Sequence, residues 1–262
     1  MTKTISIANQ KGGVGKSTTA ITMASVLKEK GFNVLLIDTD MQCNSSRTYE
    51  AKMDDTETLF DVLLIKKTIP MIEAIQHTPK GDILPSDKLL RNADEVLKKD
   101  LEKLKRKIDE IKKTGQYDYI IFDTNPTLNS LLYSVLVASD ELIIPVEPDV
   151  FSIEGLVQLR ETIETIQVNE NKDLKVAGIL LLKLNERTRL GRAVVDLLDE
   201  TAKEFKTIFY SSTIRRSQAV PDSLAIRKTL LEYAPESTSA LDYMDFVDEY
   251  LKNEVKNDGQ SS

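Results

Sequence analysis

Several residue types are scarce in this 262-residue sequence, and each scarcity excludes a class of protein. The chain has one cysteine, Cys43, and one histidine, His77. A single chain therefore cannot assemble a Cys/His zinc site or an iron–sulfur cluster, since both need several such ligands. Cys43 cannot form an internal disulfide, which is typical of a reducing cytoplasm. No apolar run approaches the ~20 residues of a membrane-spanning helix, so we expect no membrane partner.

Positive charge is in the minority, with 35 Lys and Arg against 42 Asp and Glu and a formal net charge of -7. Any contact with nucleic acid must therefore come from a local basic patch. Acidic residues dominate residues 229–262, whereas a membrane-anchoring helix would be basic. The length fits one α/β domain over residues 1–262, and we expect residues 253–262 to be a disordered tail.

The most informative stretch is residues 4–18, where an apolar, β-branched run leads into a glycine-rich turn and a helical pattern. Strand, turn and helix in this order are the context of a P-loop. Glycines let backbone N–H groups surround phosphate oxygens, and the helix N-terminus adds partial positive charge. Lys16 would reach the β- and γ-phosphates, and the Ser17 hydroxyl would bind Mg²⁺. The predicted ATP-binding residues are Lys11, Gly12, Gly13, Val14, Gly15, Lys16, Ser17 and Thr18.

A dinucleotide-binding turn is the competing interpretation of the same residues. Gly13-Val14-Gly15 begins a G-x-G-x-x-G pattern, and Asp38 lies roughly where a ribose-binding acid would be. Thr18 replaces the third glycine, however, and a pyrophosphate cradle does not require adjacent Lys16 and Ser17. The sequence therefore favours the P-loop.

Two further buried strands are predicted to end in aspartates. Residues 33–38 end at Asp38, which Asp40 follows closely, and residues 117–123 end at Asp123. Strands and helices alternate along the chain, which predicts a mostly parallel twisted sheet with helices on both faces. Ligands bind at the carboxyl ends of such strands, and P-loop ATPases use an acid there to hold Mg²⁺. The alternative for Asp38 and Asp40 is a polar loop that caps the next helix.

Residues 87–113 carry leucine and isoleucine at spacings of three and four, which predicts one long amphipathic helix. A coiled coil would show a similar pattern. We favour packing of this helix on the sheet.

A second lysine, Lys11, opens the glycine-rich loop, and Gln10 stands where the general P-loop has its first glycine. In these features the chain resembles the deviant P-loop ATPases of the ParA/MinD family. The resemblance extends over almost the whole sequence, through residues 11–18, 38–42, 123–126, 143–146, 152–156, 176–184, 185–191 and 213–216.

The resemblance implies roles for individual residues in an ATPase that is weak without its partner. Lys11 would reach the partner's nucleotide in an ATP-bound sandwich homodimer, and Asp40 would help to position the attacking water. With Lys16, these are the expected catalytic residues. Ser17, Asp38 and Asp123 would support Mg²⁺. Met41, Asn125 and Arg215 depart from the family pattern, and the first two flank regions that would control the hydrolysis rate.

The resemblance also implies a plasmid or chromosome partition ATPase that binds DNA without sequence preference near the nucleoid. A ParB-like centromere-binding protein would stimulate hydrolysis and release the DNA. Basic residues concentrate in two regions, and the predicted DNA-binding residues are Arg187, Arg189, Arg192 and Arg216. No aromatic residues alternate with them, so phosphate contact is the expected mode of binding. Their alternative is a solvated surface.

An ATP-dependent metabolic ligase or synthetase of the same fold is the second functional hypothesis. It would bind ATP in the same loop but transfer phosphate to a small-molecule acceptor. Such an enzyme would need neither Lys11 nor a basic patch, so we favour the partition ATPase.

Overall fold

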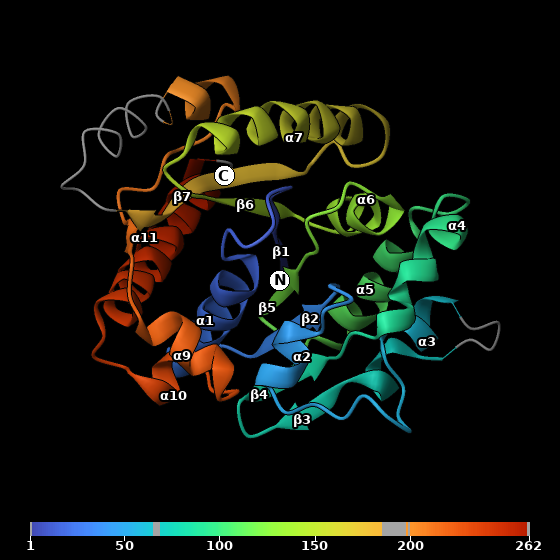
Figure 1. Ribbon diagram of the computed structural model, residues 1–262. Coiled ribbons are helices and arrows are strands. Elements are labelled where there is room, and N and C mark those ends of the chain that lie inside the picture. Colours follow the sequence, from blue (N-terminus) through green and yellow to red (C-terminus); the bar gives the residue numbers. More distant parts are fainter. Residues whose placement is uncertain (1, 65–68, 185–197, 199, 261–262) are drawn as a thin grey trace.

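The computed structural model describes residues 2–64, 69–184, 198 and 200–260, without the side chains of residues 150–154 and 256–260. Within them, eight strands form one sheet in the order β3-β4-β2-β5-β1-β6-β7-β8 (Figure 1). Only β3 pairs antiparallel with its neighbour, which confirms the predicted mostly parallel sheet. The strands are β1 (Lys3–Ile7), β2 (Val34–Asp38), β3 (Gln76–Thr78), β4 (Gly81–Leu84), β5 (Tyr119–Asp123), β6 (Glu141–Val146), β7 (Lys175–Leu184) and β8 (Ile214–Arg215).

Helices cover both faces of the sheet, so successive residues of its central strands enter different cores (Figure 1). Ile121 of β5 packs in the first core, which α1 and α11 cover, whereas Ile120 and Phe122 pack in the second core under α3 to α6. A third core lies under α6 and α7. The helices are α1 (Lys16–Glu29), α2 (Asn44–Thr48), α3 (Leu59–Leu64), η1 (Met71–Ala74), η2 (Lys88–Asn92), α4 (Ala93–Leu97), α5 (Lys103–Thr114), α6 (Ser130–Val137), α7 (Val150–Asn169), α9 (Ala219–Ala225), α10 (Leu230–Tyr233) and α11 (Thr238–Gln260).

The prediction of one long helix over residues 87–113 is wrong, because η2, α4 and α5 divide this segment. Leu97 and Leu104 lie on either side of the turn and both pack in the second core, so the apolar spacing continues although the helix does not. Asp94 of α4 accepts a hydrogen bond from the Ser130 backbone N–H of α6, at 2.7 Å. Tertiary contacts of this kind override the local periodicity.

The C-terminal helix also differs from expectation. Helix α11 continues to Gln260, so most of the segment that we expected to be a tail is helical. Across the described residues, no helix combines the length and apolar character that crossing a membrane requires.

The carboxyl ends of β1, β2 and β5 lie side by side at one edge of the sheet. Asp123 at the end of β5 is in register with Ile7 of β1 on one side and with Asp38 of β2 on the other. The loop that follows β1 therefore crosses an edge that already holds two aspartates.

Candidate nucleotide site

The glycine-rich loop joins β1 to α1 and is fixed at its start by Asn9. The Asn9 side-chain amide donates to the Pro145 carbonyl at 2.7 Å, and its carbonyl accepts from the Lys11 N–H at 2.9 Å. At the end of the loop, Gly15 adopts a left-handed φ of 107° and no side chain caps α1. This φ strains any residue with a side chain, and a Cβ on Gly15 would also lie 2.7 Å from Leu182 Cδ1, so the position favours glycine. The first N–H groups of α1 thus remain available for an anion.

Lys16 begins α1 and its side chain folds back across the loop. Its Nζ donates to the Lys11 carbonyl at 2.9 Å, and the residue is only 6% exposed. Burial lowers the pKa of Lys16, and the charges of Asp123 and Asp40 oppose this shift. A cation held in place by a neutral carbonyl is well prepared to gain a stronger partner when phosphate binds.

Lys11 lies at the rim of the loop and contacts carboxylates instead. Its Nζ forms ion pairs with Asp149 and, at 3.3 Å, with Glu147. Burial alone would lower the pKa of Lys11, but these two carboxylates outweigh burial and raise it. Sequence reasoning missed both acids, although they directly follow residues 143–146, which carry part of the family resemblance.

Two serines of α2 hold the paired aspartates at the strand ends. Asp38 accepts hydrogen bonds from the N–H and hydroxyl of Ser46, at 2.8 and 2.7 Å, and Asp123 Oδ2 accepts from the Ser45 hydroxyl at 2.7 Å. Both carboxyl groups are fully buried. Burial raises the pKa of both groups despite these hydrogen bonds, helped by the charge of Asp40 on Asp38 and of Asp38 on Asp123. The sequence offered no signal for the serines beyond their position after Asp40.

The arrangement fits a Mg²⁺ ion. Asp123 Oδ1 is buried and has no hydrogen-bond partner within the described part of the chain. The Ser17 hydroxyl is close enough to lower the pKa of Asp123, so it lies beside that carboxyl. Hydroxyl and carboxylate oxygens are the ligands that Mg²⁺ prefers. The structure thus brings Ser17, Asp38 and Asp123 close together, and their role as Mg²⁺ ligands stays a prediction.

Asp40 shapes the turn before α2 and also acts on the charge of Lys16. Its Oδ1 accepts from the Gln42 N–H at 3.0 Å, and its own N–H donates to Asp38 Oδ1 at 3.1 Å, so it shapes the turn before α2. Its charge also acts on Lys16 across the site. It is 8% exposed, and its role in positioning water stays a prediction.

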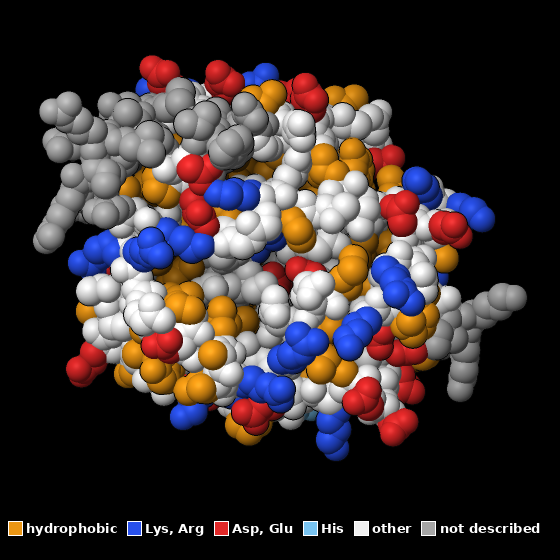
Figure 2. All heavy atoms as spheres, viewed as in Figure 1, with side chains coloured by type: hydrophobic (Ala, Val, Ile, Leu, Met, Phe, Trp, Pro, Cys, Tyr) orange, Lys and Arg blue, Asp and Glu red, His pale blue; other side chains and the backbone are white. Residues whose placement is uncertain are grey.

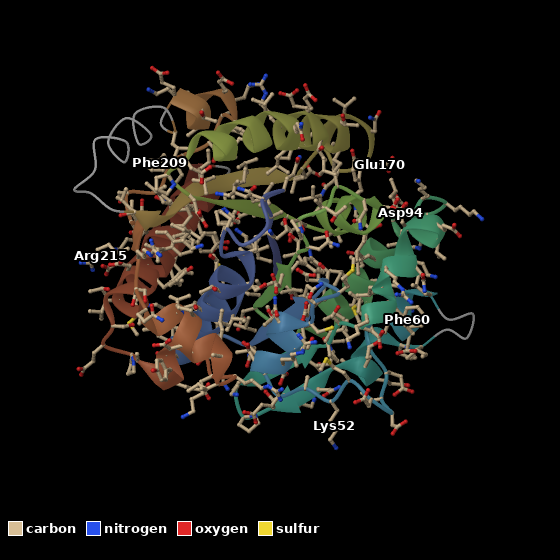
Figure 3. All side chains as sticks on the ribbon, viewed as in Figure 1. Lys52, Phe60, Asp94, Glu170, Phe209 and Arg215 are labelled. Atoms are coloured by element: carbon tan, nitrogen blue, oxygen red, sulfur yellow. The ribbon has the colours of Figure 1, made fainter. Side chains whose placement is uncertain are left out.

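A cavity of about 390 Å³ adjoins the loop, and its lining includes Gly13, Gly15, Leu182 and Tyr243. Three basic residues also line this cavity, namely Lys183, Arg215 and Arg216. Asp242 of α11 binds Arg215, accepting from its N–H at 2.8 Å and from its guanidinium. Figure 2 shows Lys and Arg side chains gathered at this end of the molecule, where Figure 3 labels Arg215.

The predicted DNA-binding residues are only partly placed. Arg216 is exposed and lies on the wall of this cavity. Arg187, Arg189 and Arg192 lie outside the described residues. Their role therefore stays a prediction.

Comparison with known proteins decides the family. A family model described as an AAA domain matches residues 2–176. The sporulation initiation inhibitor protein Soj of Bacillus subtilis is 34% identical over 97% of this chain and 100% of its own length. The chromosome partitioning protein ParA of Caulobacter vibrioides is 31% identical over 96% of this chain and 95% of its own length. This chain belongs to the ParA-type ATPase family.

A solved structure shares the fold of this ParA-type chain. The structure of a protein described as cobyrinic acid a,c-diamide synthase from Mycobacterium smegmatis, with bound ADP and magnesium, has a TM-score of 0.82 and 27% sequence identity. The match covers 98% of this chain and 97% of that one. The ParA-type ATPase described here is thus a P-loop nucleotide hydrolase by family.

Proposed function

We propose that this protein is a partition ATPase that binds ATP with Mg²⁺, dimerises around it and then binds DNA without sequence preference. A ParB-like, centromere-binding partner stimulates hydrolysis and so releases the DNA. The full-length similarity to a chromosome partitioning protein supports this proposal, as does a relative solved with ADP and magnesium.

In this proposal the described residues have separate roles in hydrolysis. Backbone N–H groups of the loop and the Lys16 ammonium bind the phosphates. Ser17, Asp38 and Asp123 would hold Mg²⁺, which would neutralise phosphate charge when bound. Asp40 orients the attacking water, and the orienting carboxylate stays fixed by its hydrogen bond from the Gln42 N–H.

The position of Lys11 is the observation that carries the proposal. Lys16 already supplies a cation across the loop, whereas the Lys11 ammonium lies at the rim among carboxylates and its side chain is 30% exposed. Rim placement leaves this ammonium able to meet a phosphate that arrives from outside the chain. The ATP bound to a second protomer carries such a phosphate, which supports an ATP-dependent sandwich dimer.

Sedimentation and DNA retention with and without ATP test this function. We expect the native chain to dimerise only with ATP and to bind non-specific DNA in that state, because a two-fold dimer doubles the basic contacts on one face. Binding should weaken steeply with salt, since each neutralised phosphate releases a counterion. Lys11→Ala should stay monomeric at the same ATP concentration.

Two further variants complete this experiment. Lys30→Ala is the matched control. Lys30 lies at the far end of α1 from the loop and forms an ion pair with Asp248, at 2.5 Å, so this variant should dimerise like the native chain. Arg187→Ala should lower DNA retention while ATP binding persists. A chain that stays monomeric under all nucleotide conditions would refute the dimer, and a dimer without DNA affinity even at low salt would refute the DNA contact.

An ATP-dependent ligase is the second candidate, because the relative with a TM-score of 0.82 is described as a diamide synthase. Its signature would be ATP hydrolysis that depends on a carboxylic acid and an amine donor rather than on DNA or a protein partner. Acceptor-dependent phosphate release by a monomer would favour it.

A further inference from the structure

Strand β7 is irregular at Lys183, next to the nucleotide site. Its register with β8 shifts between Leu182 and Leu184, and Lys183 has a left-handed φ of 57°. Leu180 and Leu182 pack in the first core, but Leu184 packs in the third core on the opposite face. Regular alternation would place all three on one face. Lys183 is therefore the extra residue of a β-bulge, and bulges next to active sites commonly redirect a side chain.

The bulge directs the Lys183 side chain onto the phosphate loop. Its Nζ donates to the Gly13 carbonyl at 2.8 Å and forms an ion pair with Glu147 Oε1 at 2.5 Å. The other oxygen of Glu147 lies 3.3 Å from Lys11 Nζ. One carboxylate thus lies between two lysines, one from β7 and one from the loop.

We propose that Lys183 is a positioning residue for ATP binding, acting through the Gly13 carbonyl and through Glu147. The inference rests on the proposed nucleotide site and adds a residue to it. Lys183 fixes the loop at Gly13, whose φ of 73° already sets the left-handed turn. It also shares the charge of Glu147, which would otherwise act on Lys11 alone and repel an incoming phosphate.

The electrostatic half of this role predicts a compensating pair of variants. Lys183→Met keeps an unbranched apolar side chain of similar size but leaves Glu147 with one lysine, so we expect the Kd and KM for ATP to rise about tenfold with kcat unchanged. Glu147→Gln removes the charge that Lys183 offsets. The double variant Lys183→Met/Glu147→Gln should therefore recover ATP affinity to within about threefold of the native value.

ATP titration, steady-state kinetics and thermal melting of these variants test the role of Lys183 in ATP binding. Lys112→Met is the matched control, because Lys112 also pairs with a carboxylate, Asp140 at 2.8 Å, but at the opposite edge of the sheet. It should leave the KM for ATP unchanged. Native ATP affinity in a folded Lys183→Met protein would overturn the proposal, and a double variant as weak as Lys183→Met would overturn the part played by Glu147. A native chain that fails to bind ATP would instead refute the nucleotide site itself.

Discussion

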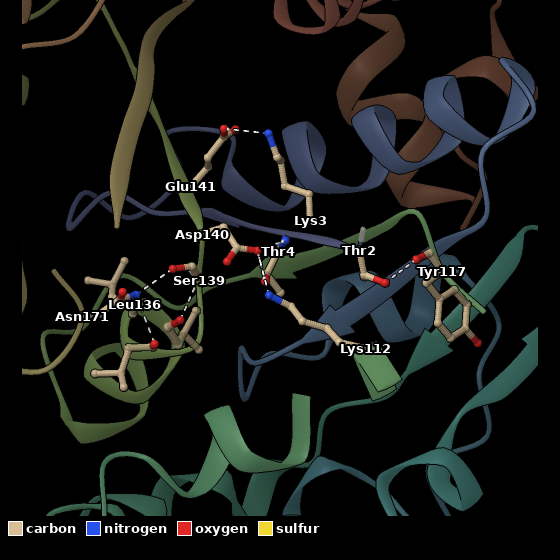
Figure 4. Close-up of polar contacts among 12 residues, drawn as sticks. Thr2, Lys3, Thr4, Lys112, Tyr117, Leu136, Ser139, Asp140, Glu141 and Asn171 are labelled. Carbon is tan, nitrogen blue, oxygen red and sulfur yellow. Dashed lines mark hydrogen bonds and ion pairs between the residues drawn. The ribbon is translucent and has the colours of Figure 1, made fainter. Parts of the chain in front are cut away.

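The two edges of the sheet use the same residue types in opposite ways. At the amino ends of the strands, Asp140 accepts hydrogen bonds from the N–H and hydroxyl of Thr4, at 2.7 and 2.6 Å, and from Lys112 at 2.8 Å (Figure 4). At the carboxyl ends, Asp123 Oδ1 is buried without a hydrogen-bond partner among the described residues. One aspartate is satisfied by the chain, and the other has bonding capacity left for a ligand.

The pKa shifts follow this division. Burial alone would raise the pKa of Asp140, but Lys112 and Thr4 outweigh burial and hold it below its usual value. For Asp38 and Asp123 burial prevails, and the pKa of each is raised. Titratable groups whose charged form is destabilised in the folded chain are typical of functional sites.

Two lysines show the same contrast. Lys3 pairs with Glu141 at 3.1 Å and with Glu254 at 2.6 Å, and these carboxylates raise its pKa although burial opposes the shift. Lys16 has a carbonyl as its hydrogen-bond acceptor, and burial lowers its pKa. The amino-end lysine pairs with carboxylates of the fold, whereas the carboxyl-end lysine is the one that we propose binds phosphate.

Lys16→Ala has the largest expected effect and tests this contrast directly. We expect kcat/KM for ATP to fall about a thousandfold, since one preorganised donor to the reacting phosphates is lost. The free energy of unfolding without nucleotide should stay the same or rise, because a poorly compensated buried cation is removed.

The matched variant is Lys3→Ala, for which we expect the reverse: lower stability and unchanged kcat/KM. Urea denaturation and steady-state kinetics measure both quantities. Normal ATPase activity in folded Lys16→Ala would contradict the P-loop assignment, and equal losses of stability in the two variants would remove the contrast between the edges.

Asp40→Ala tests whether Asp40 and Lys16 have different roles at the carboxyl ends of the strands. In the proposed mechanism Asp40 orients water rather than nucleotide, so the variant should bind ATP and dimerise but hydrolyse about a hundredfold more slowly. It should accumulate as a stable dimer, which light scattering detects. Failure to bind ATP would show that Asp40 has a structural or metal-binding role instead.

The sequence predicted the carboxyl edge well because its residues follow their strands and glycines directly. Asp38 and Asp123 end buried strands, and Lys16 follows Gly15, so local order alone brings them to one edge. Residues that reach the site by a backbone irregularity or a long-range contact were missed. Lys183 enters through a bulge that nothing in the run of leucines around it indicates.

The fold shows the same limit at other places. Alternating strands and helices predicted the parallel sheet, but the apolar spacing of residues 87–113 could not reveal the turn between α4 and α5. That turn depends on packing against α6, through contacts such as Asp94 with Ser130. The amino-edge network around Lys3 and Glu254 joins the two ends of the chain and has no local signal either.

Asp140→Asn has the smallest expected effect. The pH dependence of its free energy of unfolding tests the hydrogen-bond network at the amino ends of the strands. Because the folded-state pKa of Asp140 lies below its unfolded value of about 4, its contribution to stability is present above that pH and is lost as the pH falls through the folded-state pKa. The side chain is 46% exposed, so we expect a loss of about 1 kcal/mol at pH 7. Urea denaturation should show this difference from the native chain shrinking toward pH 3, with ATP affinity at pH 7 unchanged. A difference that does not shrink as the pH falls, or a weaker affinity for ATP, would contradict the assignment of Asp140 to stability alone.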